Sequence, residues 1–148
     1  MGTKDEAEVF VEGLKAVVAE LKDKRETISL NQRDFIASTP PTFVLIDDVD
    51  AFVAYITEKA TELAPLIQEA GGLGVCFITT SMSSKLKGFD AVTNLFKAPQ
   101  AGMILGNPQD SLMHYPSANV LKSQKPTQGI GFWAKRGDFK KIKLPFIE

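Results

Sequence analysis

Cysteine and histidine are the scarcest reactive residues of this sequence, which has one of each, Cys76 and His114, among 148 residues. A lone cysteine cannot build a disulfide framework, and one cysteine with one histidine cannot supply the ligands of a structural zinc site. No apolar run approaches the roughly 18 residues that cross a bilayer. The first ten residues are acidic and lack the apolar region of a secretory signal peptide. These absences predict a protein of a reducing compartment that is stabilised by a packed core.

An excess of one charge is also missing, since 17 basic and 18 acidic residues leave a formal net charge of −1. A nearly neutral chain has no general field that attracts nucleic acid, so nucleic acid is not an expected partner. The hydrophobic content of 44% is ordinary for a folded protein. A chain of this length buries enough surface for one core, and we expect a single domain over residues 1–148.

Two short apolar runs, Phe43–Ile46 and Val75–Thr79, are predicted to be strands because they are too short for helices. A continuous apolar run is typical of a strand that is buried on both faces of a parallel sheet. Cys76 lies in the middle of the second run, so we expect its thiol to be buried.

Helical patterns flank both runs. Apolar residues at steps of three and four predict helices over about 5–24 and 51–70, and Pro65 is expected to kink or divide the second. Shorter helices are predicted near 31–35 and over 89–96.

The C-terminal part is predicted to contain a third strand over 101–105, a turn or helix near 111–113, and a hairpin of 129–134 with 141–144. Arg136-Gly137-Asp138 supplies the turn of that hairpin. The alternation of strands and helices predicts an α/β fold with three parallel strands flanked by helices and a C-terminal β-hairpin.

Aromatic and basic residues gather in the predicted hairpin. Phe132 and Trp133 are neighbours on a strand, so one should face the core while the other is free to form a partner pocket. The lysines of the tail suit a solvated edge strand that resists pairing with other chains. The alternative is a docking surface for an acidic partner. The basic residues concerned are Lys135, Arg136, Lys140, Lys141 and Lys143.

Two acids, Asp47 and Asp48, follow the first predicted strand directly. Carboxylates at the carboxyl end of a parallel strand point into the crevice where ligands bind. One acid there can hold a nucleotide-bound Mg²⁺ through water while the second orients an attacking water. A structural interpretation is equally open, in which Asp48 or Asp50 caps the helix that follows.

The partner motif of such a site is missing. No G-x-x-x-x-G-K-[ST] phosphate-binding loop occurs in the chain, so a complete ATP site cannot be built from these residues. A phosphoacceptor receiver domain fits poorly, because the strand over 75–79 does not end in the required Asp and the strand over 101–105 does not end in the required Lys.

At this point the sequence resembles a known family. Residues 42–50 are similar to the Walker B segment of the FtsK/SpoIIIE-type ATPase domains of type VII secretion motors, where an aliphatic run ends in Asp-Asp. Residues 74–81 look like the next strand with its sensor segment, and 101–108 resemble the following core strand. Residues 125–144 look like the closing Pro-x-x-Gly-x-Gly hairpin. The chain most resembles the last ATPase domain of the EssC/YukB/EccC proteins, in Gram-positive bacteria.

The resemblance implies a partial P-loop (RecA/ASCE-like) fold and a set of site residues. It implies Asp47 and Asp48 as Walker B-like catalytic residues, with Asp47 holding Mg²⁺ through water in a complete site, and Thr80 and Ser81 as sensor-like nucleotide-binding residues. ATP and Mg²⁺ would belong to the parent protein, and this chain alone is expected to bind no cofactor. The family's second Walker B acid is usually Glu, and an Arg often lies near its sensor; this chain has Asp48 and lacks that Arg.

The resemblance implies a module of a secretion motor at the cytoplasmic face of the bacterial membrane, attached through parts outside this chain. Its expected partners are exported small helical proteins and neighbouring ATPase domains, and its expected role is coupling or substrate recognition without catalysis. One alternative is a genuine ATP-hydrolysing domain whose phosphate-binding loop lies upstream. Another is an adaptor unrelated to secretion, in which Asp47 and Asp48 have only a structural role.

Overall fold

The computed structural model describes residues 4–82, 85–99, 101–106, 125, 128–135 and 138–145. The chain divides into two compact units, which are described separately. The N-terminal unit comprises Met1–Ser81 with Asp90–Val92, and the C-terminal unit comprises Met82–Phe89 with Thr93–Glu148. The single-domain expectation stays a prediction.

The N-terminal unit begins with two helices, α1 (Lys4–Ile28) and α2 (Gln32–Ser38). Buried apolar side chains recur along one side of α1 at steps of three and four, which confirms the predicted amphipathic helix. The amide of Asp34 donates to the side chain of Asn31, which caps α2. The apolar side of α1 is formed by Ala7, Val11, Leu14, Val18 and Leu21.

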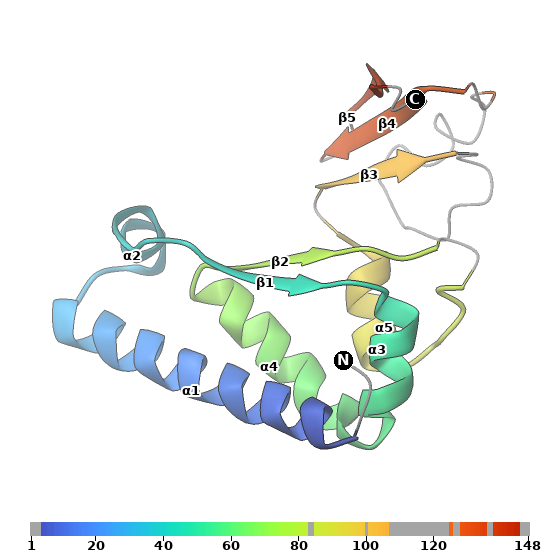
Figure 1. Cartoon of the computed structure of the whole chain (residues 1–148). Coiled ribbons are helices and arrows are strands. Elements are labelled where there is room, and N and C mark those ends of the chain that lie inside the picture. Colours follow the sequence, from blue (N-terminus) through green and yellow to red (C-terminus); the bar gives the residue numbers. More distant parts are fainter. Residues whose placement is uncertain are drawn as a thin grey trace. The chain divides into compact units, whose positions relative to one another are not determined.

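Strands β1 (Thr42–Ile46) and β2 (Val75–Thr79) form a parallel pair with Thr42 opposite Val75 and Ile46 opposite Thr79. The connection between them is helical, as a parallel crossover requires. In Figure 1 the helices α1 and α4 lie on the same side of this strand pair. The α/β class and the first parallel pair are thus confirmed.

The other side of β1 and β2 departs from the expectation. Phe43 and Leu45 are 58% and 74% exposed, and their partners in the register, Cys76 and Ile78, are exposed as well. The prediction that both strands are buried on both faces, with a buried Cys76, is therefore wrong. The reason is that α4 packs on one face of the pair, with α1 against α4 on the same side. Side chains that alternate along the strands are therefore buried in one direction and not in the other.

The helical connection is divided, but not at the proline. It consists of α3 (Val49–Ile56), the 3₁₀ turn η1 (Thr57–Lys59) and α4 (Ala60–Gly72), and Pro65 lies inside α4. Pro65 lacks the N–H that would reach Thr61 at the start of α4. The helical connection is instead interrupted upstream of Pro65, at the tighter 3₁₀ turn η1.

The C-terminal unit holds an antiparallel sheet of β3 (Ala101–Leu105), β4 (Ile130–Lys135) and β5 (Asp138–Lys143), in that order. The helix α5 (Ala91–Lys97) precedes β3. Ala101 pairs with Lys135 and Leu105 with Gly131, so β3 runs against β4. The third strand lies where the sequence predicts it, but the predicted parallel pairing is wrong, because β3 pairs antiparallel with β4 in a separate sheet. The predicted hairpin is confirmed.

One face of this antiparallel sheet carries the core of the unit, with Ile104, Phe132 and Ala134 buried and Ile130 and Phe139 packed against them. Phe132 is fully buried and Trp133 is 39% exposed, which confirms their predicted alternation.

The opposite face of the sheet carries Met103, Leu105 and Trp133, which are exposed. A Cβ atom on Gly131 would come within 3.1 Å of Leu105 Cδ2 and 3.3 Å of Ile142 Cγ1. The side chains of Leu105 and Ile142 therefore close over Gly131 and extend this apolar face across all three strands.

Several sequence-based expectations lie outside the described residues: His114, the turn or helix near 111–113, Asn107-Pro108 of the resemblance, and Arg136-Gly137 of the hairpin turn. Within the described part of the chain, no helix has the length and apolar character needed to span a membrane.

Candidate functional site

The two predicted site segments meet at the carboxyl end of the parallel pair. The ladder continues past the strands, because the amide of Thr80 donates to the carbonyl of Ile46 (3.0 Å) and the amide of Val49 donates to the carbonyl of Thr80 (2.9 Å). This pairing places the hydroxyl of Thr80 beside Asp47, and it donates a hydrogen bond to Asp47 Oδ1. A carboxylate and a hydroxyl from segments 33 residues apart thus form one contact.

The turn between β1 and α3 brings the second acid to the same place. Asp48 has φ of +59°, in the left-handed region that Asp tolerates better than most residues. Its amide donates to Thr80 Oγ1 at 3.1 Å. The hydroxyl of Thr80 therefore accepts from Asp48 and donates to Asp47, which fixes its direction.

The remaining site residues lie close in sequence. Ser81 follows Thr80 and is half-buried. Asp50 lies in the first turn of α3, where a negative charge is favoured by the helix dipole. The structure thus joins Asp47, the Asp48 backbone and Thr80 at one point.

The donor types at this point are those that Mg²⁺ prefers, namely carboxylate and hydroxyl oxygens. In the part of the chain that the structure describes, however, no three His, Cys, Asp or Glu side chains come together as a metal-binding group. Mg²⁺ is often held by one or two carboxylates with substrate phosphates supplying further ligands. Asp47 therefore fits the protein half of such a site, and the phosphate half needs a cradle that the sequence does not contain.

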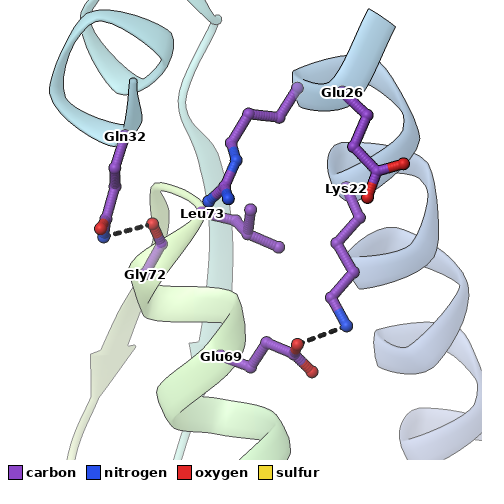
Figure 2. Close-up of a pocket in the computed structure, with 7 residues that line it drawn as sticks. Lys22, Glu26, Gln32, Glu69, Gly72 and Leu73 are labelled. Atoms are coloured by element: carbon purple, nitrogen blue, oxygen red, sulfur yellow. Dashed lines mark hydrogen bonds and ion pairs between the residues drawn. The ribbon is translucent and has the colours of Figure 1, made fainter. Parts of the chain in front are cut away.

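A cavity of about 390 Å³ lies elsewhere in the N-terminal unit. Figure 2 shows Lys22 of α1 reaching Glu69 of α4 in an ion pair, and Gln32 of α2 donating to the carbonyl of Gly72 at 2.7 Å. These contacts fasten the ends of three helices together. None of the predicted site residues is in its lining, which consists of Lys22, Arg25, Glu26, Gln32, Glu69, Gly72 and Leu73.

A second ion-pair group links α1 to α4. Lys15 donates to Glu12 at 2.8 Å and pairs with Glu62. The hydrogen bonds with Glu12 and then Glu62 raise the pKa of Lys15 above its ordinary 10.5. The hydrogen bond from Lys15 lowers the pKa of Glu62 below its ordinary 4.5. All three side chains are exposed to water, so these ion pairs add little stability to the contact between α1 and α4.

Sequence reasoning missed one feature that has functional potential, which is the exposed apolar side of β1 and β2. The run Phe43–Ile46 is apolar at every position, so it carries no alternation that would reveal an open side. Comparisons of the chain with protein-family models, curated proteins and solved structures find no match. The family resemblance therefore stays a prediction.

Proposed function

We propose that this chain is a non-catalytic, ATPase-like module of a type VII-type protein secretion motor, which couples exported substrates to the motor. The observation that carries the proposal is the contact of Asp47 with Thr80 at the end of a parallel βαβ unit. This is the position at which a P-loop ATPase joins its Walker B acid to a polar residue of the next strand. The partial P-loop fold and the mostly parallel parent sheet are part of the same proposal.

The chain's sequence argues against hydrolysis by this polypeptide alone, because it has Asp47 and Asp48 without a G-x-x-x-x-G-K-[ST] loop. Calorimetric titration with Mg-ATP should therefore give no heat of binding. Micromolar binding that Asp47→Ala abolishes would overturn this part. Asp23→Ala, on the exposed side of α1, is the matched control for loss of an acid.

The coupling role predicts a protein partner. The proposed partners are small helical proteins exported by the same motor and the neighbouring ATPase domains, at the cytoplasmic face of the cell membrane. Surface binding kinetics should show saturable capture of such a helical substrate by the immobilised chain, unchanged by Asp47→Ala. Binding that requires Mg-ATP, or no binding to any substrate of the motor, would contradict the coupling role.

The hydrolytic alternative keeps one observation in its favour, which is the fixed direction of the Thr80 hydroxyl toward Asp47. The coding sequence upstream of Met1 decides between the two. An in-frame G-x-x-x-x-G-K-[ST] about 100 residues earlier would favour a genuine ATPase. In that case the longer polypeptide should hydrolyse ATP and Asp48→Asn should remove the activity.

A further inference from the structure

We infer that this chain associates head to tail with a second copy of itself, through two exposed apolar sheet faces that complement each other in charge. The first, called here the β1–β2 open face, consists of Phe43, Leu45, Cys76 and Ile78. The second, called the β3–β5 open face, consists of the exposed Met103, Leu105 and Trp133 and the half-buried Ile142. The inference does not depend on the proposed nucleotide site.

Each face exposes large apolar side chains, as surfaces that bind other proteins do. Leu45 is 74% exposed on the first face, and Leu105 is 62% exposed on the second. A sheet with one apolar face covered and the other open normally buries the open face against another layer. Two such faces pack about 10 Å apart with interdigitating side chains. The single chain presents one of each kind, so a second copy supplies the layer that each face lacks.

Although the net charge is nearly neutral, the two parts of the sequence carry opposite net charges, which favours a second copy as the partner. Residues 1–81 carry 7 basic and 14 acidic side chains, and residues 82–148 carry 10 basic and 4 acidic side chains. The net charges are therefore −7 and +6. Contact between the first part of one copy and the second part of another brings opposite charges together, whereas contact between like parts opposes them.

The charges lie close to the faces themselves. Asp47 and Asp48 follow directly on β1, at the end of the β1–β2 open face. Lys140 is opposite Trp133 in the register and shares its side of the sheet, and Lys135 lies two residues from Trp133 on the same side. An apolar centre with charged residues beside it is the usual arrangement of a specific interface.

The pairing of two different faces has a distinctive consequence. A contact between two different faces is heterologous, and the rotation that it imposes decides whether the copies form a closed ring or an open series. Because each face has only about four apolar side chains, we expect a dissociation constant on the order of 10–100 µM. Sedimentation velocity should then show a sedimentation coefficient that rises with concentration, and rises less steeply in high salt because the charges are screened.

The test uses two variants that each destroy one face. Leu45→Lys and Leu105→Lys change exposed side chains, and each should weaken self-association about tenfold or more. Mixed together, they should form a one-to-one complex that stops at two chains, since each retains the face that the other lacks. Val9→Lys is the matched control, at a 72% exposed position of α1 outside both faces, and should assemble as the parent chain does.

Circular dichroism checks that the variants are folded, and the reaction of Cys76 with a thiol reagent provides a second measurement. Its rate should fall as the concentration of the parent chain rises, and should not fall for Leu105→Lys. A concentration-independent monomer would overturn the inference, as would a Cys76 that is protected in the monomer. Continued assembly of either variant alone would also overturn it, because the contact would then join like faces or use another surface.

Discussion

The two sheets of this protein differ in the direction of their strands and in what covers their buried faces. In the N-terminal unit, β1 and β2 are parallel, and α4 of the crossover packs on one of their faces. In the C-terminal unit, β3, β4 and β5 are antiparallel, and the core includes Phe132 and Phe139 from the strands themselves. Both sheets leave one apolar face open. An open face therefore results from the lack of a second covering layer, whether the strands are parallel or antiparallel.

The largest expected effect tests how much core each unit has. Phe132 is fully buried in the small cluster of the C-terminal sheet, and Phe132→Ala should cost about 4 kcal/mol and unfold that unit. Leu63, fully buried in α4, lies among more apolar neighbours, and Leu63→Ala should cost about 3 kcal/mol.

The chain carries a natural probe of the C-terminal unit, because Trp133 is the single tryptophan and lies on β4. Urea unfolding followed by Trp133 fluorescence should lose its transition in Phe132→Ala and keep it in Leu63→Ala. Circular dichroism of the helices follows the N-terminal unit in the same samples. Loss of both transitions in either variant would show that the two units unfold as one.

The next effect compares two glycines. Gly74 precedes β2 with φ of +94°, and a Cβ there would lie 3.3 Å from Ile36 Cγ1. Gly74→Ala should therefore cost about 1–2 kcal/mol through backbone strain. Gly131→Ala meets only the ends of Leu105 and Ile142 and the carbonyl of Ile104, and should cost less than about 1 kcal/mol, since Leu105 can turn toward water. Thermal unfolding measures the loss of stability in each variant, and a larger loss for Gly131→Ala than for Gly74→Ala would contradict the prediction.

A smaller effect concerns the contact at the end of the parallel pair. Thr80→Val removes the hydroxyl that links Asp47 to the Asp48 amide, and should cost about 0.5–1 kcal/mol because the contact is exposed. Thr80→Ser retains the hydroxyl and is the control. Denaturant unfolding followed by circular dichroism measures the stability of both variants. Equal stability of Thr80→Val and Thr80→Ser would show that this contact does not stabilise the fold.

The smallest effect is the pH dependence of the α1–α4 ion pairs. Because the pKa of Glu62 is lower in the folded chain than its ordinary 4.5, its contribution is present above about pH 4.5 and is lost as the pH falls through the folded pKa. Because the pKa of Lys15 is raised, its contribution is present below about pH 10.5 and is lost as the pH rises through the folded pKa.

Glu62→Gln should therefore flatten the acid side of the stability curve slightly, and 1 M salt should hide the difference by screening. Glu8→Gln, an exposed acid of α1, is the control for loss of one charge. An unchanged acid slope in Glu62→Gln would show that the ion pair does not contribute.

Much of the candidate site follows from the sequence. The sequence predicts strands over 75–79 and 101–105 with the bounds that the structure shows, because these short apolar runs lie between turn residues. Asp47 comes from the acids that follow the first strand, and Thr80 comes from the family resemblance. Their contact is seen only in the structure. The φ of Asp48, which turns its amide toward Thr80, is a matter of tertiary contact that no local pattern carries.

The sequence by itself determined where most elements begin and end, the α/β class, and that Phe132 and Trp133 lie on opposite faces of their strand. Only the tertiary structure decided that β3 runs against β4, and that Phe43, Leu45 and Cys76 face water. The physical reason is that periodicity records burial along one element, whereas strand direction and an open face depend on which other elements supply hydrogen bonds and a covering layer.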